Sequence, residues 1–393
     1  MAVDWTQLPP ELVESISNNL TTYADYLRFR VVCRSWRSSV PSTPNNLPPQ
    51  LPWLMLPKSR HRRPHSAAFF NLSSNKVYLI NLPEALSHGK RCCGSSHGWL
   101  VILDETPSLL LLNPLTRSKF HLPPISTFPN VLRFSYSEIG REYALRSPSG
   151  ESYTQNLRQI RDSFVKKVVL SSSPKESNGF VALAILHETG DLAFCKSGDQ
   201  TWTFIEGASS YSEDVIHYNS SFYAVNKYGV VAVCDVGGST SPSVSIIIET
   251  PTQVGADMQY LVSSKDDLVL VSRYLEIDYD NSEELYRTVG FNVFRLDWSD
   301  EDEPKWDKVN DLGDQMLFIG KNSSLSLSAS DFPGCVGNCI YFTDDYSELN
   351  YESVFGEFDS GIFCLSDGTI ERKWNSHCTD YWPTPIWVSP NPF

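Results

Sequence analysis

Residues 27–38 read Leu-Arg-Phe-Arg-Val-Val-Cys-Arg-Ser-Trp-Arg-Ser, and residues 4–12 read Asp-Trp-Thr-Gln-Leu-Pro-Pro-Glu-Leu. From residue 8 to residue 20, apolar residues recur at every fourth position, as one face of a helix requires: Leu8, Leu12, Ile16 and Leu20. Pro9 and Pro10 fall where a first helical turn tolerates proline, because the N–H that proline lacks has no partner there. The spacing therefore predicts a first helix in this region.

Two more short helices are predicted before residue 41. Thr22 followed by Asp25 is typical of a capping box that opens a second helix, whose apolar face carries Leu27 and Val31. A third helix over Cys33–Ser39 would carry Trp36 and end before a proline. The three helices together bury little apolar surface, and one buried Leu or Ile contributes only ~1.5–3 kcal/mol. We therefore expect this unit to dock on the rest of the chain or on a partner.

Residues 46–65 form a proline-rich, basic linker between this helical unit and the remainder of the chain. The basic residues of the linker cluster in one run: Lys58, Arg60, Arg62 and Arg63. Such a run is typical of a nuclear import signal, and it is equally typical of a solvated linker that keeps two domains apart. The sequence leaves both interpretations open.

From residue 66 to 393 the pattern changes to short β-branched and aromatic runs at intervals of about ten residues. The predicted strands are Trp99–Leu103, Leu109–Leu112, Val168–Leu170, Val181–Leu186, Leu192–Cys195, Phe222–Val225, Val230–Cys234, Leu268–Val271, Val289–Leu296, Cys339–Phe342 and Ile362–Leu365. Asp367-Gly368 predicts a tight hairpin turn. This rhythm favours a large all-β domain.

A weak internal repeat indicates which all-β architecture this is. Residues 198–205 and 302–309 both read as a polar turn, a tryptophan, and an apolar β-branched residue three positions later, with tryptophans Trp202 and Trp306. Repeated supersecondary units indicate stacked blades, and a domain of this length at ~45–50 residues per blade gives a β-propeller of about six or seven blades. A pair of sandwiches or a large irregular barrel is the alternative.

The composition limits the class of protein. The chain has 393 residues, a net charge of −14 and 41% hydrophobic residues. The charge is uneven, because residues 1–65 carry +4 and the remainder carries −18. An acidic chain of this kind is not expected to coat nucleic acid or an anionic membrane. We also expect no secretory signal and no membrane helix. The cysteines are expected to be reduced, because nine of them, an odd number, are scattered over a long chain.

The N-terminal residues closely resemble a plant-type F-box over essentially the whole motif. The rest of the chain resembles the propeller domain that follows the F-box in the KIB-type, Skp-interacting-partner F-box proteins of plants. Three groups of residues carry this second resemblance: Gly94–Leu100 with Leu112–Arg117 and Leu122–Pro124; Val215–Tyr218 with Phe222–Val225; and Gly320–Ser323 with Phe332–Cys335, Asn338–Phe342 and Asp344-Asp345. Residues 125–165 match no clear motif.

The resemblance implies three parts: an F-box of three helices at 1–45, the linker at 46–65, and the propeller at 66–393. It implies the substrate-recognition subunit of a Skp–cullin–F-box ubiquitin ligase, located in the nucleus, the cytoplasm or both. The F-box would bind a Skp-type adaptor, and through it a cullin and a RING protein. The propeller would bind an unknown protein substrate. The residues expected at the adaptor are Leu8, Pro9, Leu12, Ile16, Leu20, Leu27, Val31, Cys33 and Trp36.

The chain shows no catalytic motif, so we expect no catalytic residue, no cofactor and no metal. Cys335 and Cys339 with His377-Cys378 lack the close paired spacing of zinc ligands, and buried cysteines on strands are the simpler interpretation. Two alternatives stay open. One is a propeller-type hydrolase with a helical cap, which would need acids or a histidine converging on the propeller axis. The other is an F-box adaptor that acts outside ubiquitination.

Overall fold

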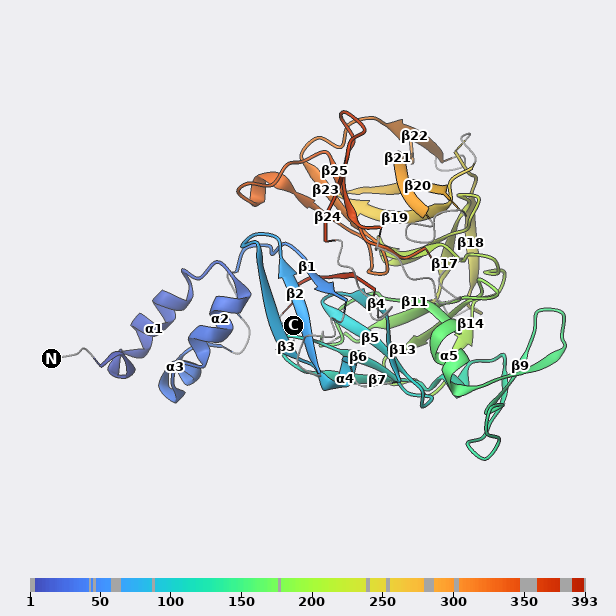
Figure 1. Ribbon diagram of the computed structural model, residues 1–393, viewed down its shortest axis with the longest axis horizontal. Helices are drawn as coiled ribbons and strands as arrows, with labels where there is room; N and C mark the ends of the chain where they lie inside the picture. The colour runs from blue at the N-terminus through green and yellow to red at the C-terminus, as the bar shows by residue number, and fades with distance from the viewer. Residues whose placement is uncertain are drawn as a thin grey trace.

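The structure is a computed structural model that describes residues 4–41, 44, 47–57, 65–86, 89–175, 178–237, 241–251, 255–278, 286–299, 304–346, 359–374 and 384–391. A small helical unit lies at one end of the molecule and a β-propeller fills the rest (Figure 1). The helical unit contains η1 (Trp5–Gln7), α1 (Pro10–Ser17), α2 (Tyr23–Arg30) and α3 (Arg34–Ser39). Within the described residues, no helix has both the length and the apolar character needed to cross a bilayer.

The three predicted helices are confirmed, and local chemistry sets where they start. Pro10 occupies the first turn of α1. The Thr22 hydroxyl accepts the Asp25 amide at 3.1 Å and caps α2. The Cys33 sulfur accepts the Trp36 amide at 3.4 Å and caps α3. The unit also has a small core of its own, made of Val13, Tyr23, Tyr26, Phe29, Trp36 and Val40.

Within the described ranges, six sheets form the ring of the propeller and a seventh lies outside it. Blade 1 contains β28 (Ile386–Val388), β1 (Trp53–Leu56), β2 (Ser66–Asn71) and β3 (Lys76–Asn81). Blade 2 contains β4 (Lys90–Ser96), β5 (Trp99–Asp104), β6 (Leu109–Leu112) and β7 (Lys119–Leu122). Blade 3 contains β11 (Val165–Leu170), β12 (Val181–Leu186), β13 (Leu192–Lys196) and β14 (Thr203–Phe204). The short helix α4 (Pro83–Leu86) connects blades 1 and 2.

The other three blades complete the ring. Blade 4 contains β15 (Asp214–Tyr218), β16 (Ser221–Val225), β17 (Val231–Asp235) and β18 (Ser243–Ile248). Blade 5 contains β19 (Met258–Ser264), β20 (Asp267–Ile277), β21 (Tyr286–Asp297) and β22 (Lys305–Val309). Blade 6 contains β24 (Leu325–Ser328), β23 (Gln315–Ile319), β25 (Cys339–Phe342), β26 (Gly361–Cys364) and β27 (Ile370–Arg372), with η3 (Ala329–Asp331) after β24. All the predicted strands are therefore present, and the described part of the chain forms a ring of six blades.

The ends of the propeller sequence meet in blade 1. Strand β28, from the C-terminal end, pairs antiparallel with β1, with Trp53 opposite Val388 and Met55 opposite Ile386. This pairing closes the ring, because blade 1 is built from both ends of the domain. Blade 6 departs from a simple meander, because β23 runs parallel to β25 while β24 lies on its other side. The Asp367-Gly368 turn joins β26 to β27 as predicted, with Gly368 at φ 69°.

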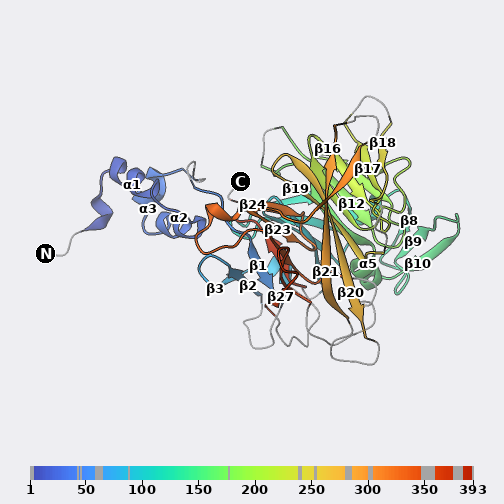
Figure 2. The same ribbon diagram turned by 90° about the horizontal axis from the view of Figure 1, so that it is seen from above.

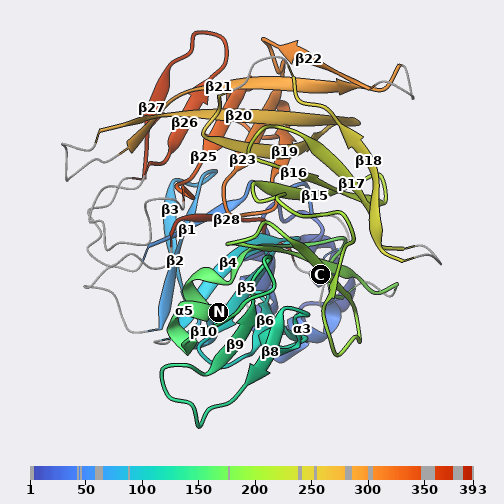
Figure 3. The ribbon, with the colours of Figure 1, turned by 90° about the vertical axis from the view of Figure 1, so that its right-hand side faces the viewer.

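The stretch that matches no motif forms an insertion between blades 2 and 3. It contains η2 (Ile125–Thr127), the three-stranded sheet of β8 (Val131–Phe134), β9 (Tyr143–Arg146) and β10 (Ser152–Gln155), and helix α5 (Leu157–Ser163). The inserted sheet lies at the opposite end of the molecule from the helical unit (Figure 2). Viewed along this long axis, it lies beside blade 2, across the ring from blades 5 and 6 (Figure 3).

The hydrophobic core lies between neighbouring blades. Along β5, Val101 and Leu103 pack in the cluster shared with blade 3, whereas Leu100 and Ile102 pack in the cluster shared with blade 1. Alternate residues of a strand point to opposite faces, and here both faces are buried. The sequences of these strands are therefore continuous apolar runs, and for this reason the strands could be predicted from the sequence.

The repeated tryptophans tie blades together at their outer strands. The Trp202 indole N–H, just before β14, donates to the Pro123 carbonyl just after β7 of the preceding blade, at 2.9 Å. The Trp306 indole N–H, in β22, donates to the Glu249 carbonyl just after β18 of the preceding blade, at 3.0 Å. The two bonds occupy equivalent places in blades 3 and 5. Trp202 also stacks on Phe128 of the insertion, with ring centroids 4.6 Å apart.

We expect Trp202→Phe to lower the free energy of unfolding by about 1–3 kcal/mol, because it leaves a buried carbonyl without its donor. Trp306→Phe should lower it by about 0.5–1 kcal/mol, because the Glu249 carbonyl lies at the surface and water can replace the indole. Chemical denaturation of the full chain measures both values. Tyr228→Phe, on an exposed turn, is the control and should change little. Equal effects of all three substitutions would contradict the interblade role.

Candidate functional site

The helical unit exposes apolar side chains at two places. On α1, Leu12 and Ile16 lie one turn apart and are 51% and 40% exposed. At the junction of α2 and α3, Val31 and Val32 are 75% and 55% exposed. Large apolar side chains that stay in water on so small a unit indicate a surface that a partner covers.

The predicted adaptor residues divide into two groups. Pro9, Leu12, Ile16 and Val31 are exposed. Leu8, Leu20, Leu27 and Cys33 are partly buried against the core of the helical unit. Trp36 is buried in that core, where its ring lies 4.5 Å from that of Phe29 and its indole N–H donates to the Trp5 carbonyl at 3.0 Å. The buried and partly buried residues of this second group stabilise the helical unit itself. Contact with the adaptor stays a prediction for all nine residues.

One side of the helical unit is already occupied by the propeller. The Arg28 guanidinium of α2 lies 5.3 Å from the centroid of the Tyr78 ring in β3. Leu115, in the turn after β6, packs against the helical core, and Ala24 packs against the core between blades 1 and 2. The Gln50 amide, in the linker, donates to the Thr21 carbonyl at 2.9 Å. Docking on the rest of the chain is thus confirmed, and the exposed places described above remain for a partner.

The basic run of the linker and two of the residues considered for zinc lie outside the described residues. Lys58, Arg60, Arg62 and Arg63 belong to this group, as do His377 and Cys378. Import by the basic run stays a prediction. Within the described residues, no group of three His, Cys, Asp or Glu side chains is arranged to hold a metal ion.

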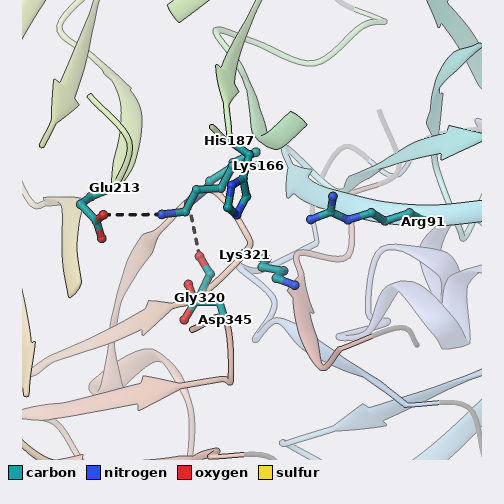
Figure 4. A pocket seen from close by; sticks show the side chains of 8 residues that line it. Arg91, Lys166, His187, Glu213, Gly320, Lys321 and Asp345 are labelled. Atoms are coloured by element: carbon teal, nitrogen blue, oxygen red, sulfur yellow. Dashed lines mark hydrogen bonds and ion pairs between the residues drawn. The ribbon is translucent and has the colours of Figure 1, made fainter. Parts of the chain in front are cut away.

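A second candidate site is a small pocket at the centre of the propeller (Figure 4). The inner strands lie around it, and each contacts the next in the order β28, β4, β11, β15, β19 and β24. The pocket is lined mainly by charged side chains from four blades: Arg91, Lys166, Lys167, His187, Glu213, Gly320, Lys321 and Asp345. Lys166 points toward Glu213, and the two charged groups lie 3.7 Å apart.

A buried ion pair beside the pocket joins four blades. Lys167 Nζ of blade 3 lies 2.6 Å from Asp214 Oδ1 of blade 4, and it also donates to the Gly320 carbonyl of blade 6 at 3.2 Å. Asp214 Oδ2 accepts the Leu261 amide of blade 5 at 3.1 Å and the Ser324 hydroxyl of blade 6 at 3.3 Å. Lys167 and Asp214 are both buried. We call this group of interactions the axial hub.

The segment Gly320–Ser324, which leads from β23 to β24, extends the axial hub to blade 2. The Ser323 amide donates to the Ser95 carbonyl at 2.6 Å, and Asn322 pairs with Ser95 in a parallel bridge. Gly320 has φ 144°, and a Cβ there would overlap the Thr343 hydroxyl. Only glycine fits this position, because both the backbone conformation and the close neighbour exclude a side chain.

The pocket carries excess positive charge. Burial, followed by repulsion from the nearby Lys166, Arg91 and Lys321, lowers the pKa of His187 from 6.5 to about 4. Burial, followed by repulsion from Arg91, lowers the pKa of Lys321 to about 8. Burial also raises the pKa of Asp214, against the opposing effect of Lys167. His187 is therefore neutral at pH 7.

The charged groups of the pocket and the axial hub are better placed to hold the blades together and to bind a ligand than to perform acid–base catalysis. Asp214 is held by Lys167, and Asp345 is held by Arg273. A general acid or base needs a side chain poised to exchange a proton near neutral pH, and the His187 pKa lies far below that range. The pKa of Lys321, about 8, does lie near that range, but Asp214 and Asp345 are already paired, so the hydrolase alternative gains a cluster of charges at the axis rather than a defined acid–base pair.

Sequence reasoning did not identify the axial hub or a second cluster of buried charges between blades 5 and 6, although Asp344 and Asp345 of that cluster belong to a stretch that carries the family resemblance. In that second cluster the fully buried Arg273 lies 3.2 Å from Asp345 and 2.9 Å from Asp359. The Tyr286 hydroxyl donates to Asp344 at 2.7 Å. A signal was present, because charged residues almost never lie inside apolar strands unless they are paired, as Lys167 and Arg273 are here. The motif stretches at Ser95, Val215 and Gly320 lie beside the same centre.

We expect the effect of Asp344→Asn on stability to depend on pH. Burial, followed by repulsion from Asp359, raises the pKa of Asp344 from 3.8 to about 6 in the folded chain. The stability that comes from holding this proton is present at low pH and is lost as pH rises through 6, whereas Asn does not titrate. The unfolding free energy of the variant relative to wild type should rise by about 2 kcal/mol between pH ~4.5 and ~7.5. Denaturation at both pH values measures it.

Asp331→Asn, an exposed carboxylate on η3, is the matched control and should show the same difference from wild type at both pH values. An Asp344→Asn effect that is equally independent of pH would contradict the protonation of Asp344.

Comparison with known proteins agrees with this geometry. The F-box domain family model matches residues 5–47, and the KIB1-4 beta-propeller family model matches residues 69–364. F-box protein SKIP23 of Arabidopsis thaliana is 30% identical, covering 98% of this chain and 96% of the relative. F-box protein At2g17036 of the same plant is 27% identical, covering 98% of this chain and 95% of the relative.

Solved structures show only distant similarity. The Cps50 (Swd1) beta-propeller domain of Myceliophteria thermophila aligns with a TM-score of 0.35 and 10% identity, covering 79% of this chain and 83% of that one, too little to support an inference. The family matches cover both structural units, and the relatives span nearly the full length. The chain therefore belongs to the F-box proteins that carry a KIB1-4 beta-propeller.

Proposed function

We propose that this protein is a substrate-recognition subunit of a Skp–cullin–F-box ubiquitin ligase, with no catalytic step of its own. The observation that supports this most directly is the division of the helical unit's surface. Helix α2 packs on the propeller, whereas Leu12 and Ile16 of α1 and Val31 and Val32 after α2 stay exposed. A Skp-type adaptor that buries these side chains would complete the unit. A cullin and a RING protein would then join through the adaptor.

The propeller supplies the substrate-binding part of the proposal. Its blades are tied at the axis and at their outer strands, so its surface loops are held on a rigid scaffold. The charge of residues 66–393 is −18, which favours substrates that present a basic surface. No observation favours the hydrolase alternative over binding. An F-box adaptor acting outside ubiquitination differs only in the events after adaptor binding, and substrate turnover that is insensitive to cullin inhibition would indicate it.

We expect Leu12→Asp and Ile16→Asp to weaken binding of the full chain to a purified plant Skp adaptor by roughly tenfold or more each, equivalent to about 1.4 kcal/mol. Each substitution places a charge where an apolar contact would form, and each site is exposed, so the helical unit should stay folded. A binding assay on surface-immobilised adaptor measures the dissociation constant of each variant. Ile139→Asp, at a 90% exposed position in the turn between β8 and β9, is the matched control and should bind like wild type.

Two outcomes would contradict the proposal: wild-type protein that binds none of the Skp adaptors tested, or Leu12→Asp and Ile16→Asp variants that bind as wild type does. Trp36→Ala is a poorer test, because Trp36 is buried and its loss would unfold the helical unit itself.

The same variants give a way to find the substrate. Deleting residues 1–45 would uncover Tyr78 and Leu115, which the helical unit now contacts. A Leu12→Asp/Ile16→Asp double variant keeps that contact while it loses the adaptor. Proximity labelling with this variant should accumulate substrates that wild-type protein directs to degradation. Equal recovery of all labelled proteins from both forms would argue against a degradative role.

A further inference from the structure

Two cysteines face each other across neighbouring strands of blade 6. Cys339 of β25 and Cys364 of β26 are directly opposite in the antiparallel register, and their sulfur atoms lie 3.3 Å apart. Both are free thiols in the structure. Cys339 is buried and Cys364 is partly exposed.

The register of the two strands suits a covalent bond between these sulfurs. The adjacent pair, Asn338 and Leu365, is hydrogen-bonded, because the Leu365 amide donates to the Asn338 carbonyl at 3.0 Å. Hydrogen-bonded and non-hydrogen-bonded pairs alternate along an antiparallel ladder, so Cys339 and Cys364 occupy a non-hydrogen-bonded pair. In such pairs the Cα atoms lie about 4.5 Å apart, which falls within the range that a disulfide spans.

A pocket between blades 1 and 6 lies next to this pair of cysteines. Tyr341 and Ile362 form the next cross-strand pair on the same face of the sheet, two residues from Cys339 and Cys364. Both line a pocket of about 460 Å³, whose other walls include Phe70, Trp374 and a third cysteine, Cys335. Pockets of this size admit small organic molecules.

We propose that Cys339 and Cys364 are a redox modification site that forms a reversible disulfide across β25 and β26. The oxidant is a low-molecular-weight disulfide such as oxidised glutathione. The Cys364 thiolate attacks one of its sulfurs, forms a mixed disulfide and releases one thiolate. The Cys339 thiolate then attacks the Cys364 sulfur and releases the second. Two protein thiols are oxidised and one small disulfide is reduced to two thiols, because the two protons that the protein thiols lose pass through solvent to the two leaving thiolates.

The surroundings assign the order of the two steps. Cys364 is the more accessible sulfur and reacts first. Burial, followed by the neighbouring Cys364, raises the pKa of the Cys339 thiol to about 12, so Cys339 acts as the resolving thiol only once the mixed disulfide lies beside it. The disulfide would covalently connect β25 and β26, the two strands that carry Tyr341 and Ile362. Oxidation thereby fixes one wall of the pocket.

The test is to incubate the folded, full-length protein with oxidised glutathione, block the remaining thiols, and map the linkages. Trypsin leaves Cys335, Cys339 and Cys364 in one peptide, residues 322–372, so chymotrypsin is used, which cuts after Phe342 and Phe363 and separates Cys364. Cys335 and Cys339 stay in one peptide, and fragment-ion spectra of the linked peptides show which of the two is bonded to Cys364. We expect the Cys339–Cys364 linkage to exceed any other pairing on the order of tenfold, because the sulfurs are held together. Dithiothreitol should reverse it.

Two variants serve as controls. Cys335→Ser removes the third thiol of the pocket and should still form the Cys339–Cys364 bond. Cys364→Ser should leave Cys339 reduced under the same conditions. The proposal is overturned if the folded protein keeps both thiols, if Cys364 carries only glutathione while Cys339 stays free, or if the linkage involves Cys335. Circular dichroism before and after treatment confirms that the folded form was tested, and a sample oxidised in denaturant gives the distribution of random pairing.

Discussion

The buried contact between Lys167 and Asp214 is the constraint on which the propeller depends. A pair of charges is expensive to remove from water, and it is tolerated only when each partner is close and its remaining hydrogen bonds are satisfied. Here those remaining bonds go to the backbone and side chains of other blades, at Leu261, Gly320 and Ser324. Breaking the pair would leave an uncompensated charge in contact with four blades at once. The axial hub therefore fixes how the blades meet, while the apolar clusters between blades supply the larger part of the burial.

The sequence predicted the parts of the structure that depend on local pattern. Helix starts at Thr22 and Cys33 and strands such as Leu109–Leu112 were readable, because caps and apolar runs are short-range signals. The closure of the ring by β28 was not readable, because it pairs Trp53 with Val388 across the whole domain. The parallel pairing of β23 with β25 and the sheet inserted between blades 2 and 3 were likewise missed, since both depend on contacts between distant segments.

The candidate site was predicted only in part for a related reason. The helical spacing found Leu12 and Ile16, but a spacing marks a face without saying what covers it, and Trp36 turned inward to the core of the helical unit. At the axis, Asp214 and Gly320 lie in or beside stretches that the family resemblance singled out, yet nothing local shows that they meet. Charged residues inside apolar strands, such as Lys167 and Arg273, are the signal that would have pointed to both clusters.

Helix α2 of the helical unit contacts blade 1, and blades 3 to 6 are joined to one another through the axial hub. The most direct measurement of this arrangement is amide hydrogen exchange in wild-type protein and in Asp214→Asn. We expect protection to fall in the inner strands of blades 3, 4 and 5 and in the segment Gly320–Ser324 together. Loss of protection confined to β15, around residue 214 itself, would show that the blades are held independently and would contradict the shared role of the Lys167–Asp214 pair.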